Sequence, residues 1–143
     1  MEAVRKVGEE RVVLDSWAVI AMINREPCWE IVRDTCYAAA RAGVRFPMCT
    51  VNWCEVLYGV PRKLRGVAPE DVAELMRGLP IAVIDATEEL SSRAAALKFE
   101  HSISLGDAYA AALAMALGVP LLTGDLEFRA LEPGLAVHWL PRE

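Results

Sequence analysis

The chain alternates between short apolar runs and longer segments whose apolar residues recur every three or four positions. The short runs predict buried strands, and the longer segments predict helices with one face in a core. The predicted strands are 11–14, 44–47, 81–84, 119–123 and 136–140. The predicted helices are 16–24, 27–41, 50–59, 69–79, 87–101 and 106–118, with a short one after 125. Helices between successive strands are typical of an α/β fold. We expect a three-layer sandwich with a central, mostly parallel sheet of about five strands.

The length of the chain fits a single domain spanning residues 1–143. Hydrophobic residues make up 55% of it, which is enough for a full core, and no linker or internal repeat divides it. The longest apolar stretch, 108–122, is broken by Gly118 and Pro120 and is too short for a membrane span. Residues 1–10 are charged and lack the apolar region of a signal peptide, so we expect a cytoplasmic protein.

Cysteine spacing and net charge restrict the chemistry further. The four cysteines form no CxxC pair, and the only histidines are His101 and His138. This pattern predicts buried free thiols and argues against a zinc site. The formal net charge of −5 disfavours a nucleic-acid partner, unless several acids are gathered around bound cations that cancel them locally.

Four acids fall at positions that the predicted topology brings to one edge of the sheet. Asp15 directly follows the first strand, and Asp125 lies two residues after the fourth. Glu55 lies in the helix after the second strand, and Asp107 begins the helix that leads into the fourth. In open α/β folds ligands bind beyond the carboxyl ends of the strands.

Each acid also has an ordinary explanation. Asp15 and Asp107 could be helix N-caps, and Asp125 could be a turn residue. Glu55 could be a solvated helix acid, but its helix is mostly apolar, so we expect it to have a polar partner.

Together, the four acids predict a site for divalent cations. Crowded carboxylates repel one another and raise their pKa values, and a bound cation removes that cost. Mg²⁺ and Mn²⁺ prefer oxygen ligands. Such a site suits phosphoryl chemistry, in which a metal-activated water attacks phosphorus. The sequence carries no P-loop, GxGxxG or GxSxG motif that would favour other chemistry.

The motifs around the four acids resemble those of the PIN domain, and most closely the VapC-type toxins of toxin–antitoxin pairs. The motifs are VLDS at Asp15, NWCEVLYG at Glu55, SLGDA at Asp107 and LLTGDLEF at Asp125. The resemblance implies a Mg²⁺- or Mn²⁺-dependent endoribonuclease with these acids as its catalytic cluster. It implies that Asp15 and Asp107 are the strongest metal ligands, that Asp125 also binds metal, and that Ser16 and Thr123 support them. It further implies a homodimer and a small antitoxin partner.

Basic and aromatic residues offer weaker indications of an RNA site. The densest basic cluster, Arg62, Lys63 and Arg65, could contact RNA phosphates or form a solvated turn. The tryptophans could stack on bases, although packing in a core or interface is favoured for them; they are Trp17, Trp29, Trp53 and Trp139.

Three other hypotheses remain. A housekeeping PIN nuclease that processes RNA would carry the same acids, and an adjacent antitoxin gene would favour the toxin. A receiver-like signalling domain would need a lysine after a late strand, and none of the three lysines (Lys6, Lys63 and Lys98) lies there. A non-catalytic Mg²⁺-binding module is disfavoured because all four acids are present.

Overall fold

The computed structural model describes residues 10–142. The prediction that residues 1–10 do not form a signal peptide therefore falls almost entirely outside the described residues. No helix within residues 10–142 is long and apolar enough to cross a membrane.

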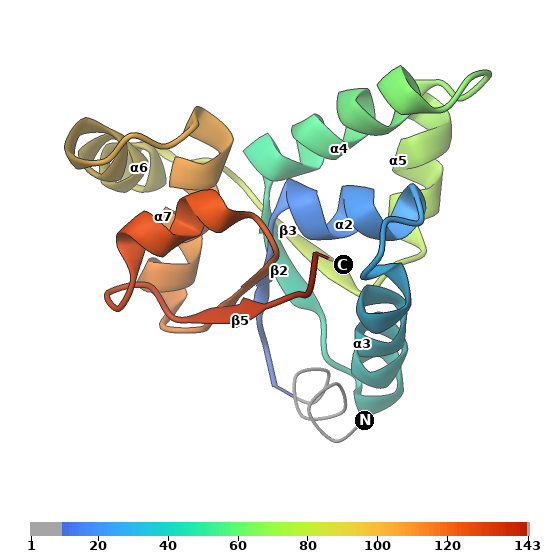
Figure 1. Ribbon diagram of the computed structural model, residues 1–143, viewed down its shortest axis with the longest axis horizontal. Coiled ribbons are helices and arrows are strands. Elements are labelled where there is room, and N and C mark those ends of the chain that lie inside the picture. Colours follow the sequence, from blue (N-terminus) through green and yellow to red (C-terminus); the bar gives the residue numbers. More distant parts are fainter. Residues whose placement is uncertain (1–9, 143) are drawn as a thin grey trace.

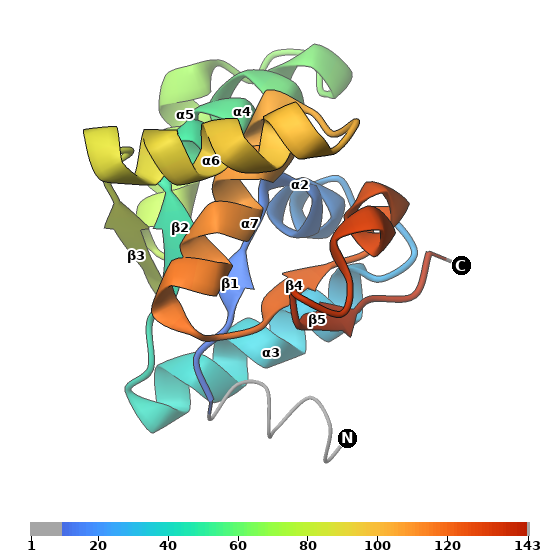
Figure 2. The same cartoon turned by 90° about the vertical axis from the view of Figure 1, so that its left-hand side faces the viewer.

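Five parallel strands form the centre of the fold, as the sequence predicted. They are β1 (Val13–Leu14), β2 (Phe46–Cys49), β3 (Ile81–Ile84), β4 (Leu121–Thr123) and β5 (Val137–Trp139). Hydrogen bonds join them in two parallel ladders, one of order β1-β4-β5 and the other of β2 with β3. β1 lies beside β2, so the two ladders are neighbours (Figure 2). β1 is only two residues long because the chain leaves it at Asp15 to start the next helix.

Helices cover both faces of the strands, which confirms the three-layer architecture (Figure 1). The helices are α2 (Ser16–Ile23), α3 (Trp29–Ala42), α4 (Thr50–Lys63), α5 (Pro69–Arg77), α6 (Glu88–Glu100), α7 (Leu105–Leu117) and the 3₁₀ helix η1 (Leu126–Leu131). Side chains of α2 to α5 form one buried cluster with Leu14, and those of α6, α7 and η1 form another with Val13. These neighbours in β1 face opposite layers because side chains alternate along a strand.

Helix α4 differs most from its predicted bounds. Its N-cap is Cys49 rather than Thr50, and it continues past Gly59 to Lys63. Gly59 does not end the helix. Instead it lets α2 pack closely, since a Cβ there would lie 2.9 Å from Cδ1 of Ile20. Arg62 and Lys63 therefore belong to the last turn of α4 rather than to a separate turn.

Near α3, two other elements begin at residues that differ from the predicted ones. The helix begins at Trp29 rather than at Pro27. β2 begins at Phe46 rather than at Val44, because the N–H of Val44 still bonds to the carbonyl of Ala39 in the turn that ends α3. Gly43, with a φ of 71°, makes that turn.

The cysteine prediction is correct for three of the four thiols. Cys28, Cys36 and Cys49 are buried and unpaired, but Cys54 is exposed. Position 54 falls on the solvent side of α4, between the buried residues Asn52 and Val56.

Candidate active site

The carboxyl ends of β1 and β4 bring the first acid beside Thr123. Because Leu14 pairs with Leu122, the next residues, Asp15 and Thr123, lie opposite each other. The Thr123 hydroxyl donates to Oδ2 of Asp15 at 2.5 Å and accepts from the backbone N–H of Asp125 at 3.0 Å. Oδ1 of Asp15 caps α2 by accepting from the N–H of Ala18 at 2.9 Å. Asp15 is therefore an N-cap and a member of the acidic cluster at once.

Glu55 reaches the same place from the second turn of α4, and it has the polar partners that its apolar helix predicted. Its Oε1 accepts from the Ser16 hydroxyl and from Nδ2 of Asn52, each at 3.0 Å. The same amide nitrogen of Asn52 donates to the carbonyl of Gly106 at 3.0 Å, which ties α4 to α7. A Cβ at Gly106 would overlap the Glu55 carboxylate, so any other residue there would displace that carboxylate from its bonds to Ser16 and Asn52.

Asp107 lies in the first turn of α7, but it does not cap the helix. Ser104 is the N-cap, and its hydroxyl accepts from the N–H of Asp107 at 3.2 Å. The Asp107 carboxylate is thus free to face the other acids, although the residue is only 9% exposed. Its Oδ2 is buried and has no hydrogen-bond partner.

Asp125 and Glu127 complete the cluster. Asp125 caps η1 by accepting from the backbone N–H of Glu127 at 3.0 Å. One carboxylate oxygen from each of Asp107, Asp125 and Glu127 lies within 4.8 Å of the other two. Sequence reasoning missed Glu127. Its signal was the Asp-x-Glu spacing directly after the fourth strand, where a tight turn brings the two acids together.

Burial is the main cause of the perturbed acidity of the two most enclosed acids. It raises the pKa of Asp15 to about 7, with a further increase from the charges of Asp125 and Glu55. The bonds from Thr123 and Ala18 oppose this rise. The pKa of Asp107 is also raised, first by burial, then by the charge of Asp125, and then by a hydrogen bond with the Glu127 carboxyl that favours the protonated form. The predicted increase is confirmed in direction, but burial contributes more than repulsion.

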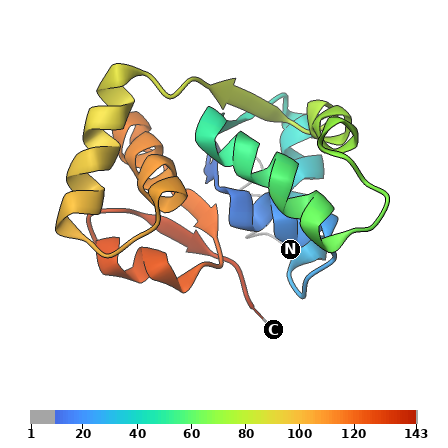
Figure 3. The same ribbon diagram turned by 90° about the horizontal axis from the view of Figure 1, so that it is seen from above.

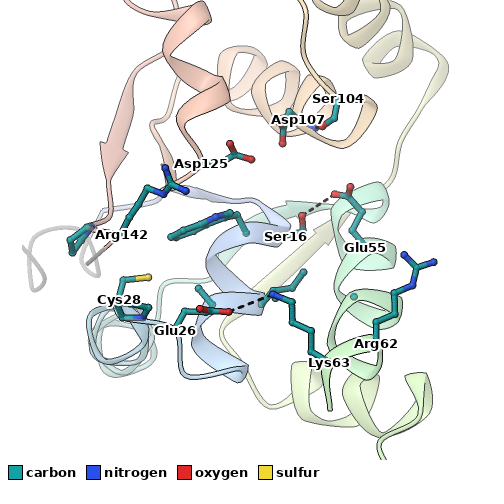
Figure 4. Close-up of a pocket in the computed structure, with 16 residues that line it drawn as sticks. Ser16, Glu26, Cys28, Glu55, Arg62, Lys63, Ser104, Asp107, Asp125 and Arg142 are labelled. Atoms are coloured by element: carbon teal, nitrogen blue, oxygen red, sulfur yellow. Dashed lines mark hydrogen bonds and ion pairs between the residues drawn. The ribbon is translucent and has the colours of Figure 1, made fainter. Parts of the chain in front are cut away.

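Three of the acids, Glu55, Asp107 and Asp125, line a cavity of about 580 Å³ that also has basic side chains in its wall (Figure 4). Ser16 lines it as well. The other charged lining residues are Glu26, Arg62, Lys63 and Arg142. Lys63 pairs with Glu26 at 3.5 Å, and the Arg62 guanidinium stacks on Tyr58, 4.8 Å from the ring centroid.

Three of the predicted site residues stand apart from this cavity, and one of them is the buried Thr123. Arg65 lies beyond the end of α4 and does not line it. Asp15 is 1% exposed and lies behind the cavity wall, with both of its carboxylate oxygens already hydrogen-bonded.

The chemistry of the cluster fits Mg²⁺ or Mn²⁺. Every candidate ligand is a carboxylate oxygen, the type that these cations prefer. Within residues 10–142 no lysine or arginine forms an ion pair with the cluster. The buried Oδ2 of Asp107 receives no donor, and a charged oxygen in that position is costly unless a cation compensates it. Asp107, Asp125 and Glu127 are the residues that could hold such an ion.

The sequence matches the PIN domain over residues 12–132, so the chain belongs to the PIN domain family. No curated protein matches it. Its structural neighbours are VapC toxins and their complexes, at low sequence identity.

Three of these neighbours match most of the chain. The VapBC2 structure from Rickettsia felis, bound to a promoter DNA fragment, has a TM-score of 0.69 at 16% identity and covers 92% of this chain and 100% of its own. VapC20 from Mycobacterium tuberculosis, described as a sarcin-ricin loop cleaving toxin, has a TM-score of 0.68 at 16% identity and covers 85% of this chain and 95% of its own. A toxin–antitoxin complex from Klebsiella pneumoniae has a TM-score of 0.63 at 20% identity and covers 87% of this chain and 95% of its own.

Proposed function

We propose that this protein is a Mg²⁺- or Mn²⁺-dependent endoribonuclease that hydrolyses phosphodiester bonds in RNA. The observation that carries the proposal is the buried, donor-free oxygen of Asp107 beside Asp125 and Glu127. Asp107 and Asp125 hold the cation in this proposal, with Glu127 as a third ligand. A bound divalent cation lowers the pKa of water and offsets the charge that develops on phosphate.

The remaining residues orient the site. Thr123 holds Asp15 and the Asp125 backbone in one network, so Asp15 contributes fixed negative charge next to the ligands and can itself complete the coordination. Ser16 and Asn52 occupy Oε1 of Glu55 and fix that carboxylate. Its other oxygen is left to accept a proton from the attacking water.

The basic side of the cavity gives the RNA backbone a binding surface. Arg62 and Lys63 line it and would contact phosphates on one side of the scissile bond. Arg65, beyond the helix end, would contact RNA only outside the cavity. Because the charge of the chain is −5, these contacts matter most when cations occupy the acidic cluster.

The biological role we propose is that of a toxin with a small antitoxin partner, acting as a homodimer. Support comes from the neighbours: VapC20 is described as a toxin that cleaves the sarcin-ricin loop, and the Klebsiella structure is a toxin–antitoxin complex. If this is right, induced expression arrests growth, and co-expression of a small protein encoded next to the gene restores it. Growth that is unaffected would favour the housekeeping nuclease. Light scattering, which measures the molar mass in solution, tests the proposed homodimer.

The nuclease proposal is tested by cleavage of structured and unstructured RNA with Mg²⁺, with Mn²⁺ or with a chelator. We expect metal-dependent cleavage that Asp15→Asn and Asp107→Asn each abolish, while circular dichroism shows that the fold survives. Cleavage that persists in chelator, or in both variants, would overturn the mechanism.

A further inference from the structure

Trp17 lies in the first turn of α2, directly after Ser16, and lines the same cavity as the acids. Its ring packs against the backbone of Gly124, where a Cβ would overlap the indole. Gly124 connects Thr123, which bonds to Asp15, with Asp125. The indole is therefore held against the strand end that carries the acidic cluster, in a half-buried position that leaves part of it facing the cavity.

Uncharged groups also line the cavity. They include Ile20, Ala21, Pro27 and Gly59. Along α4, Gly59 lies one turn after Glu55, and Arg62 and Lys63 lie a further turn on. At 1.5 Å of rise per residue, the basic turn is about 10 Å along the helix from Glu55. One phosphate cannot occupy both places, so the RNA between them must present a sugar and a base to the apolar part of the cavity.

The other tryptophans for which the structure gives ring contacts are already engaged. Trp29 is stacked by Arg25 and Arg33, whose guanidinium carbons lie 4.9 and 5.0 Å from the ring centroid. Trp139 has Arg129 at 5.9 Å and donates from Nε1 to Glu132. Trp17 has no such cation within the described residues, and it lies in the wall of the candidate active site.

From this arrangement we infer that Trp17 stacks on a nucleobase next to the phosphate that is cut. The inference rests on the proposed nuclease function and adds a determinant of substrate choice to it. An indole face accepts any base, because every base has a π-face. The base must be unpaired to reach the cavity.

The experiment compares two fluorescent single-stranded 12-mers of equal charge, oligouridylate and its abasic ribose-phosphate counterpart. Binding is measured by anisotropy with Ca²⁺ in place of Mg²⁺, and the RNA is recovered to confirm that it is intact. The proteins are the wild type, Trp17→Leu, Trp17→Phe and, as a matched charge control, Lys63→Gln. We expect the wild type to prefer the base-bearing RNA by roughly fivefold or more, the lower end of a stacking interaction.

The ratio of the affinities for the base-bearing and the abasic RNA should fall to about one in Trp17→Leu. In Trp17→Phe, which keeps an aromatic ring, most of the preference for the base-bearing RNA should remain. Lys63→Gln should weaken binding of both RNAs by the same factor. A residue that merely supports Gly124 would, when replaced, weaken both RNAs equally and leave the preference intact, which would overturn the inference. So would a wild type that shows no preference, or that binds neither RNA. If the preference behaves as expected but the wild type cleaves no RNA with any metal, the stacking site stands and the nuclease proposal fails.

Discussion

The acidic cluster has two halves that differ in how their carboxylates are satisfied. In the first, Asp15 and Glu55 accept hydrogen bonds from Ala18, Thr123, Ser16 and Asn52. In the second, Asp125 accepts only a backbone N–H, and no N–H or O–H donor of residues 10–142 reaches the buried Oδ2 of Asp107, whose side-chain neighbour is the Glu127 carboxyl. We refer to these as the bonded half and the open half.

This contrast indicates that the two halves have different roles, one in the fold and the other in binding a ligand. Hydrogen bonds fix the bonded half as part of the fold, with Asp15 capping a helix and Glu55 tying α2 to α4. Within residues 10–142 no lysine or arginine pairs with the open half, so its charge is available to a ligand. Figure 3 shows α6 and α7 grouped on one side of the molecule and α2 to α5 on the other. Asp15→Asn and Asp107→Asn should both abolish cleavage, but substitutions in the two halves should differ in their effects on metal binding and on stability.

The largest effect is expected from Asp107→Asn in the open half. It should reduce cleavage by roughly a thousandfold, since a metal site contributes several kcal/mol to the transition state. In chelator at pH 8 the same variant should unfold at a higher temperature than the wild type, because it has no buried carboxyl group to ionise or to keep protonated above its ordinary pKa. Cleavage rates measure the first effect, and thermal unfolding measures the second.

Asp34→Asn, which alters a surface acid paired with Arg33, is the control and should change cleavage very little. A less stable Asp107→Asn protein would show that the open half is satisfied in some other way.

A dependence of stability on pH is expected next, from the bonded half. An unfolded aspartate loses its proton near pH 4, whereas folded Asp15 keeps it until about pH 7. Between these values the native state binds more protons, so the free energy of unfolding of the metal-free protein falls as the pH rises from 4 to 7. The fall should be roughly 2–4 kcal/mol. Urea unfolding in chelator measures it. Asp15→Asn, which cannot titrate, should show a shallower fall, and equal slopes would contradict the role of burial.

Thr123→Val tests the network that holds the bonded half. It removes the hydroxyl that donates to Asp15 and accepts from the Asp125 backbone, and should cost about 1–3 kcal/mol of stability at pH 8. Thr123→Ser should retain most of the stability. The matched control is Thr35→Val: Thr35 is also buried, but its hydroxyl only bonds back to the carbonyl of Ile31 within α3, so its loss should cost less. Equal losses at both positions would mean that the network has no special weight.

The smallest effect is expected from Ser16→Ala. Asn52 still donates to the same oxygen of Glu55, so the carboxylate remains oriented by one bond instead of two. Cleavage should fall by roughly fivefold, about the value of one hydrogen bond, with little change in stability. A loss as large as that of Asp107→Asn would place Ser16 among the groups that act on substrate directly.

The fold and most of the cluster could be predicted from the sequence because they follow from order along the chain. Asp15 and Asp125 are placed by strand ends, and a parallel sheet brings such ends to one edge. Glu127 was missed: the Asp-x-Glu spacing after the fourth strand brings it near Asp125, but its approach to Asp107 depends on the tight turn of η1, which the spacing alone does not fix. The predicted end of α4, at residue 59, is wrong for a similar reason. A glycine at position 59 favours a helix end in the sequence, but in the structure Gly59 lies within α4 and faces Ile20, a contact between residues distant in sequence.

The division into two halves is tested most directly by Mn²⁺ binding, measured from the paramagnetic resonance signal of the free ion. We expect the wild type to bind Mn²⁺ and Asp107→Asn to bind it at least roughly a hundredfold more weakly, since even partners outside the ligand shell contribute 10–100-fold to metal affinity. Asp34→Asn should match the wild type, and Ser16→Ala should stay close to it. An Asp107→Asn protein that binds Mn²⁺ as tightly as the wild type, or a wild type that binds none, would contradict the claim that the open half holds the cation.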